Sequence, residues 1–173
     1  MRLFMNKAKD FLSVAAAMAF TFSCSSDGRG NNIGDFETVV IGTQTWMAKN
    51  LNYAVEGSKC YGNDPANCVK YGRLYEWQTA KTVCPSGWHL PSDTEWDELE
   101  NSTDAHGFLA TLGGVGNPDS SFNGAGDLGY WWGASEHERN TGAYGRGIYR
   151  NGRYVNWGII DKFLLFSVRC VGD

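Results

Sequence analysis

The sequence predicts an α+β domain with two helices, short and mostly antiparallel strands, long ordered loops and two disulfides. Three observations favour this class: two segments with helical spacing of apolar residues, several strand and hairpin patterns, and 22 glycines that indicate many turns. Aromatic residues make up 14% of the 173 residues, which is enough to build one hydrophobic core. The length that remains after the leader suits a single domain at residues 36–173.

Residues 1–23 have the pattern of a secretory signal peptide. The positive charges at its start are Arg2, Lys7 and Lys9. Residues 11–22 follow as an uncharged, mostly apolar stretch that is too short to span a bilayer. The end of the leader resembles a bacterial lipobox, in which cleavage occurs before a cysteine that receives lipid chains. Here that cysteine is Cys24, and ordinary secretion with cleavage nearby is the alternative.

A polar segment rich in Gly, Asn and Ser follows this cysteine. We therefore expect residues 24–35 to form a lipid anchor and a flexible tether. The expected protein is an exported lipoprotein of the bacterial cell envelope, held in the lipid bilayer through acylated Cys24. The outer-membrane surface is one location that such an anchor permits.

Four cysteines remain if Cys24 is acylated. They are Cys60, Cys68, Cys84 and Cys170. An even number in an exported chain predicts disulfides, and four cysteines allow three connectivities. Turn residues at 61–67 bring the ends of a short loop together, so we pair Cys60 with Cys68 and Cys84 with Cys170. Zinc is a poor alternative, because no C-x2-C spacing is present and the three histidines are scattered.

The first half of the domain contains a hairpin pattern and both predicted helices. Residues 36–41 and 44–47 read as two strands of a hairpin. The spacing of Leu74, Trp77 and Ala80 predicts a helix over 71–83. Ser92 and Glu95 form a capping box, which predicts a helix over 93–101 that buries Trp96 and Leu99.

The second half is rich in loops and short strands. Residues 107–133 are expected to be mostly ordered loop, interrupted by aromatic residues 130–132. Asn151 and Gly152 predict a hairpin turn between 149 and 154. Alternation along 166–171 predicts a final strand with one face in the core.

The motifs together resemble the Fibrobacter succinogenes major paralogous domain. They are Ile-Gly-Thr-Gln-Thr-Trp-Met-Ala-Lys-Asn-Leu-Asn-Tyr at 41–53, Lys-Cys-Tyr-Gly at 59–62, Tyr-Gly-Arg-Leu-Tyr at 71–75, Cys-Pro-Ser-Gly-Trp-His-Leu-Pro-Ser at 84–92, Glu-Trp at 95–96, Tyr-Trp-Trp at 130–132 and Phe-Ser-Val-Arg-Cys-Val at 166–171. The resemblance covers about residues 36–172. It implies an exported protein, often a lipoprotein. The chain departs from the family pattern at 101–116, which is shorter than usual.

A more distant similarity points to the C-type lectin-like fold of formylglycine-generating enzymes. Residues 90–96 are similar to their Leu-Pro-Thr-x-x-Glu-Trp helix start, and 166–170 to their terminal strand. The fold implies a disulfide between the region before this helix and the last strand, in agreement with Cys84–Cys170. Those enzymes use two copper-binding cysteines shortly before the last strand, whereas residues 131–169 contain no cysteine. The similarity therefore implies the fold and not the activity.

The segment 131–161 is the candidate ligand-binding site. Aromatic rings beside hydrogen-bonding groups suit sugar rings or flat peptide surfaces. The candidate residues are Trp131, Trp132, Tyr144, Arg146, Tyr149, Arg150, Tyr154, Asn156, Trp157 and Asp161. The alternative is that half of the aromatic residues are core, and at least one of Trp131 and Trp132 is expected to be buried, because neighbours on a strand point opposite ways.

The charge pattern is consistent with a basic, aromatic-rich patch that faces an anionic or sugar-like ligand. Residues 93–138 hold ten acidic residues and no Lys or Arg, whereas 139–169 hold six basic residues and one acid. Two solvated faces of opposite sign are the simpler explanation. An overall charge of −4 without a basic helix excludes nucleic acid as a partner.

No catalytic residue, cofactor or metal is expected. Residues 136–138 (Glu-His-Glu) are consecutive and read as loop charges. Turn chemistry explains Asn117, Asp119, Asn123 and Asp127 at least as well as calcium does. We expect a non-enzymatic binding or adhesion lipoprotein whose partner is a polysaccharide or an envelope protein. The alternatives are an enzyme of the formylglycine-generating type and a purely structural envelope protein.

Overall fold

The computed structural model describes residues 36–103, 108, 110–139, 142–155 and 159–173, and only the backbone of Tyr154 and Val155. All of them belong to one unit, Asn31–Asp173. The predicted signal peptide, Cys24 and the tether lie outside these residues. Within the described ranges, no helix is both long enough and apolar enough to cross a membrane.

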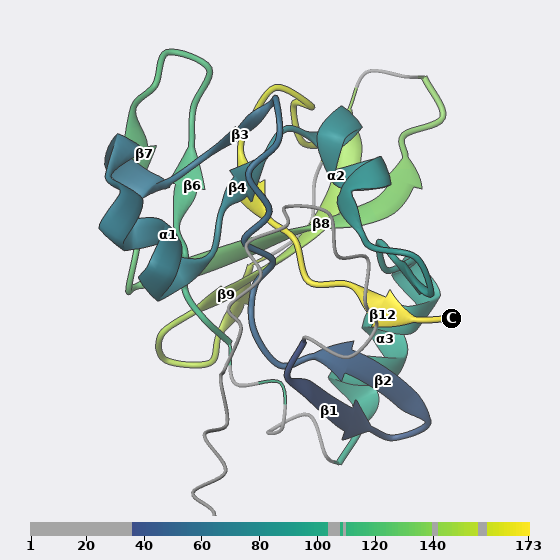
Figure 1. Cartoon of the computed structure of the whole chain (residues 1–173). Helices are drawn as coiled ribbons and strands as arrows, with labels where there is room; N and C mark the ends of the chain where they lie inside the picture. The colour runs from purple at the N-terminus through teal and green to yellow at the C-terminus, as the bar shows by residue number, and fades with distance from the viewer. Residues whose placement is uncertain (1–35, 104–107, 109, 140–141, 156–158) are drawn as a thin grey trace, which may run out of the picture. The chain divides into compact units, whose positions relative to one another are not determined.

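The strands that the structure describes form three sheets (Figure 1). The four-stranded sheet has the order β1 (Thr38–Ile41), β2 (Gln44–Met47), β12 (Val171–Gly172), β5 (Trp88–His89). The six-stranded sheet has the order β10 (Tyr154–Val155), β9 (Ala143–Tyr149), β8 (Leu128–Glu136), β11 (Phe166–Ser167), β4 (Leu74–Tyr75), β3 (Ser58–Lys59). The third pairs β6 (Val115–Gly116) with β7 (Phe122–Asn123). All these pairs are antiparallel except β8 with β11.

The predicted α+β class is confirmed, but the number of helices was wrong. The described residues contain α1 (Pro65–Tyr71), α2 (Trp77–Val83) and α3 (Asp93–Asn101), with a short 3-10 turn, η1, at Tyr61–Asn63. The helix expected at 71–83 begins only at Trp77. Gly72 ends α1 with a φ of +77°, a conformation that favours glycine. Leu74 and Tyr75 then pair with β11 and β3 instead of continuing a helix.

The third helix has the predicted start and the predicted buried face. Ser92 Oγ accepts from the Glu95 backbone N–H, and the Glu95 side chain accepts from the Ser92 N–H, so the capping box is confirmed. Trp96 and Leu99 are buried as expected. The two predicted hairpins are confirmed as well, at β1–β2 and at β9–β10, where Gly152 has a φ of +77°.

The final strand differs from the expectation. Residues 166–171 form two short strands, β11 and β12, which belong to different sheets. Both have a neighbour on each side, and all six residues are buried. The alternation therefore does not separate a core face from a solvent face. Ser167 accepts from Asn50 Nδ2 at 3.2 Å, and the Arg169 guanidinium lies 4.1 Å from the centre of the Phe108 ring.

Both predicted disulfides are confirmed. Cys60–Cys68 links the residue before η1 to α1, with Cα atoms 4.9 Å apart. Cys84–Cys170 joins the end of α2 to the segment between β11 and β12, with Cα atoms 5.9 Å apart. The second bridge ties the helical half of the domain to its last strands.

Candidate functional site

Trp131 and Trp132 are both fully buried, which corrects their assignment to a ligand-binding face. They point to opposite sides of β8, as neighbours on a strand do. Trp131 Nε1 donates to Asn50 Oδ1 at 2.8 Å, and Trp132 Nε1 donates to the Tyr75 carbonyl at 2.7 Å. Because β8 is covered on both faces, neither indole can reach a ligand at the surface.

Arg146 is also buried and does not offer its charge to a ligand. Its guanidinium pairs with three carboxylates of α3: Asp97 at 2.8 Å, Glu100 at 3.1 Å and Asp93 at 3.3 Å. Burial raises the pKa of Glu100, although Arg146 opposes the shift. The residue therefore attaches α3 to β9, a structural role that its position in a basic segment did not indicate.

The remaining candidates whose side chains the structure describes are Tyr144, Tyr149, Arg150 and Asp161. Tyr144 and Tyr149 are an odd number of positions apart in β9, so their side chains point to opposite sides of the sheet. Tyr149 is 42% exposed, and Arg150 pairs with Asp127 at 2.7 Å. Asp161 accepts from the Phe163 N–H at 2.9 Å in a turn. Asn156, Trp157 and the side chain of Tyr154 lie outside the described residues.

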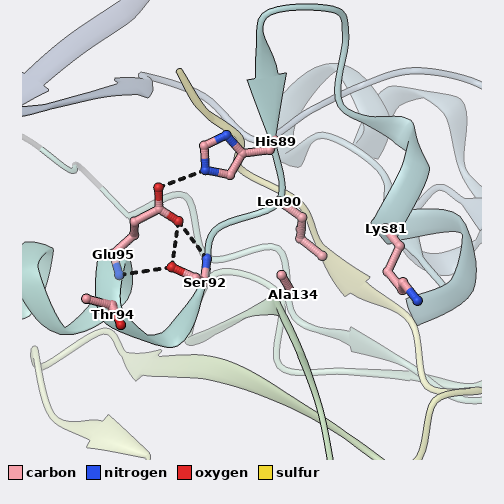
Figure 2. Close-up of a pocket in the computed structure, with 7 residues that line it drawn as sticks. All are labelled: Lys81, His89, Leu90, Ser92, Thr94, Glu95 and Ala134. Carbon is pink, nitrogen blue, oxygen red and sulfur yellow. Dashed lines mark hydrogen bonds and ion pairs between the residues drawn. The ribbon is translucent and has the colours of Figure 1, made fainter. Parts of the chain in front are cut away.

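An open hollow lies between α2 and the start of α3 (Figure 2). Its volume is about 620 Å³, and it is lined by Lys81, His89, Leu90, Ser92, Thr94, Glu95 and Ala134. Figure 2 shows Leu90 and Ala134 between Lys81 on one side and the His89–Glu95 pair on the other. Two further hollows are smaller, at about 360 and about 340 Å³. We call the largest of these three the α2–α3 hollow.

One wall of the α2–α3 hollow is a chain of hydrogen bonds. His89 Nε2 lies 2.7 Å from Glu95 Oε1, and His89 Nδ1 lies 2.6 Å from Asp173 Oδ1. The other oxygen of Glu95 accepts from the backbone and the hydroxyl of Ser92 at 2.8 and 2.7 Å. Both imidazole nitrogens thus face carboxylates, which suits the doubly protonated ring.

The electrostatics of this wall follow from those contacts. Burial disfavours the imidazolium, but the hydrogen bonds to Asp173 and Glu95 outweigh it and raise the pKa of His89 above its ordinary value of 6.5. Burial would raise the pKa of Glu95, but the hydrogen bonds from Ser92 and His89 lower it instead. The two carboxylates therefore favour the protonated form of His89.

The opposite wall contributes an ammonium group. Lys81 Nζ lies 4.6 Å from the centre of the Trp77 ring, and Lys162 Nζ lies 4.8 Å from the same ring. Lys162 also pairs with Glu136. Among the described side chains, no carboxylate forms an ion pair with Lys81, so its charge faces the α2–α3 hollow and solvent.

These groups can bind polar atoms of a ligand. Both ring nitrogens of His89 are hydrogen-bonded to carboxylates, so neither is open to a ligand in this arrangement. Ser92 bonds to Glu95 and not to the histidine. Within the described part of the chain, no group of three or more potential ligands is placed to hold a metal ion.

The patterns in the sequence did not indicate the α2–α3 hollow. His89 is one of three scattered histidines in the sequence, and Glu95 was predicted only as part of a helix cap. The six-residue spacing of these two side chains across the turn before α3 is a local signal that was available. Asp173 and Ala134 carry no such signal, because only the fold brings them to β5 and α3.

Fold and site define an α+β domain with two disulfides and an open, polar-walled hollow. Residues 39–105 match the model of the Fibrobacter succinogenes major domain, so the resemblance is confirmed over these residues. The matched region includes Lys81, His89 and Glu95, whereas Ala134 and Asp173 lie beyond it. The chain has no match among the curated proteins or the solved structures that were compared with it.

Proposed function

We propose that the chain is a non-enzymatic binding or adhesion lipoprotein of the bacterial cell envelope, and that its C-type lectin-like domain binds polysaccharide. The observation that carries this proposal is the α2–α3 hollow, with its apolar floor and polar walls. A concave site with a few convergent polar groups is the usual form of a ligand-binding site. The link between Cys84, before α3, and Cys170 supports the lectin-like fold.

The chemistry of the α2–α3 hollow suits a sugar ring. Leu90 and Ala134 offer apolar surface to the C–H face of a ring, while Thr94 and Lys81 offer hydrogen-bond donors to its hydroxyl groups. Thr94 is exposed in the first turn of α3. An open hollow accommodates part of a long chain, because the polymer can enter and leave along the surface.

The cysteines and the histidine support binding over turnover. The formylglycine-generating type of enzyme requires a free cysteine pair, whereas Cys60, Cys68, Cys84 and Cys170 are all joined in disulfides. His89 is held between two carboxylates. Turnover of a sulfatase-type cysteine peptide by the oxidised chain would contradict this part of the proposal.

A binding experiment on the full oxidised chain tests the proposal. Cellulose, hemicelluloses and a glycan panel serve as ligands, and near-UV circular dichroism checks the fold of each variant. We expect Lys81→Met and Thr94→Val to weaken binding about tenfold, which corresponds to the loss of roughly one hydrogen bond each. Lys70→Met is the matched control, since Lys70 Nζ lies 4.7 Å from the Tyr71 ring, away from the residues that line the α2–α3 hollow.

Three other outcomes would revise the proposal. If Tyr149→Ala abolished binding and the changes at the α2–α3 hollow did not, the site would lie on the Tyr149–Arg150 surface instead. Binding to an envelope protein but to no glycan would replace the polysaccharide with a protein partner. No binding to either class would favour a purely structural role.

A further inference from the structure

The guanidinium of Arg73 contacts both sulfurs of the Cys60–Cys68 disulfide. Its Nη1 lies 3.4 Å from Cys68 Sγ and 3.6 Å from Cys60 Sγ. Two contacts to Ser58 hold the group in place: Nε donates to the hydroxyl at 2.9 Å and Nη2 to the carbonyl at 3.3 Å. The cation is therefore fixed beside the bond and is not a mobile surface charge.

The intact disulfide interacts only weakly with this cation. Disulfide sulfurs are neutral and accept hydrogen bonds weakly, whereas a thiolate carries a full negative charge. Among the described residues, Arg73 forms no ion pair with a carboxylate. Its charge is thus available to stabilise a thiolate, and an adjacent Arg lowers the pKa of a thiol.

We propose that Cys60–Cys68 is a site of thiol–disulfide exchange, with Arg73 stabilising Cys68 as the leaving thiolate. The co-reactant is two equivalents of a small thiol or one dithiol. A thiolate attacks Cys60 Sγ, a mixed disulfide forms there, and the Cys60–Cys68 bond breaks with its electron pair on Cys68 Sγ. A second thiolate then attacks the outer sulfur of the mixed disulfide, releasing the oxidised reagent and Cys60, which takes a proton from solvent. The reagent loses two electrons and the protein gains them.

The two sulfurs differ in access, which sets the direction of attack. Cys60 is half-buried and Cys68 is only 6% exposed, so a reagent reaches Cys60 first. The buried sulfur then leaves toward Arg73, the nearer of the two contacts. A low-pKa leaving thiol departs faster, so the arginine assists this step.

The second disulfide is an internal reference. Cys170 is fully buried, whereas Cys60 is half-buried. This bridge closes a separation of 86 residues against 8 for Cys60–Cys68. We therefore expect the two bonds to differ in reduction potential, with Cys60–Cys68 the more easily reduced.

Equilibration of the full chain with mixtures of reduced and oxidised glutathione tests the proposal. Free thiols are trapped by alkylation and each cysteine peptide is quantified by mass spectrometry. We expect Arg73→Met to lower the equilibrium constant for reduction of Cys60–Cys68 about tenfold, or about 30 mV, and to leave Cys84–Cys170 unchanged. The variant should also raise the pH at which reduced Cys68 becomes reactive toward iodoacetamide.

A structural role alone would move this measurement in the opposite direction, because a loosened loop makes its disulfide easier to reduce. Reduction of Arg73→Met as readily as the parent, or equal potentials for the two disulfides of the parent, would overturn the proposal. If Arg73→Met does not fold, Ser58→Ala removes the hydroxyl that holds Nε, and the expected change is smaller with the same sign. An unchanged potential in that variant would overturn the proposal as well.

Discussion

Trp131 and Trp132 are adjacent in β8, yet their indoles belong to two different hydrophobic clusters. Trp131 packs with Trp46, Trp96 and Phe108, its ring centre 5.5 Å from that of Phe108. Trp132 stacks on Phe166 in the other cluster, with ring centres 4.4 Å apart. These two neighbouring residues therefore attach both hydrophobic clusters to β8.

Replacement of either tryptophan should therefore damage stability and not a binding surface. We expect Trp132→Ala to lower the free energy of unfolding by about 3–5 kcal/mol, because it removes a large buried side chain and leaves its surroundings unpacked. Tyr149→Ala, at a 42% exposed position, should cost much less. Urea denaturation measures both, and a near-neutral Trp132→Ala would contradict the burial described for β8.

The attachment of α3 through Arg146 gives a second stability prediction. Arg146→Met leaves Asp97 and Glu100 without their cation, and we expect a loss of about 2–3 kcal/mol, reduced from the value for a fully buried pair because Asp97 is mostly exposed. Arg150→Met is the matched control, since its pair with Asp127 is 70% exposed on both sides. That change should cost under about 1 kcal/mol. Equal losses in the two variants would argue against a special role for Arg146.

The raised pKa of His89 and the lowered pKa of Glu95 predict a pH window of added stability. For His89 the contribution is complete below the unfolded-state pKa near 6.5 and is lost as the pH rises through the higher folded-state pKa. For Glu95 it is complete above a pKa near 4.5 and is lost as the pH falls through the lower folded-state pKa. The two contributions are therefore complete together between about pH 4.5 and 6.5.

Guanidinium denaturation at pH 5.5 and at pH 8.5 tests this window. The parent should lose stability between these two values by more than His89→Asn does, because the variant lacks the titrating group. Nuclear magnetic resonance titration of the His89 ring should give a pKa above 6.5. A ring that titrates below that value would show that burial outweighs the two carboxylates.

The two disulfides should contribute unequally to stability. The chain-entropy model gives about 4.6 kcal/mol for the separation of 86 residues at Cys84–Cys170 and about 2.5 kcal/mol for the 8 at Cys60–Cys68. The pairs Cys84→Ser with Cys170→Ser, and Cys60→Ser with Cys68→Ser, measure these losses by thermal unfolding. A larger loss at the short loop would point to native contacts there that outweigh the entropy of the unfolded chain.

Local signals in the sequence predicted the local structure well. The capping box at Ser92 and Glu95, the Asn-Gly turn at 151–152 and the two disulfides are all present. The helix expected at 71–83 was wrong in its first turn, because strand pairing by Leu74 and Tyr75 overrides a spacing that also suits a helix. Gly72, one residue after the end of α1, was the feature of the sequence that indicated a break in this helix.

The candidate site was harder to predict, because it depends on which face of each strand is covered. Alternation along a strand cannot show that both faces of β8 and of residues 166–171 are buried. Nor can it show that Arg146 meets the acids of α3, about fifty residues earlier in the chain. The α2–α3 hollow depends on the same long-range contacts, which bring Ala134 and Asp173 to its edges.

The position of β12 has a consequence for the order of folding. This strand lies between β2 and β5, so these two strands, both from the family-matched region, are joined within the sheet only through residues 171–172. A nascent chain that ends before Cys170 lacks one of the two inner strands of its four-stranded sheet and cannot close the bridge to Cys84. The four-stranded sheet therefore forms only after residues 171–172 have been synthesised. Contacts between residues so far apart in the sequence favour slow folding.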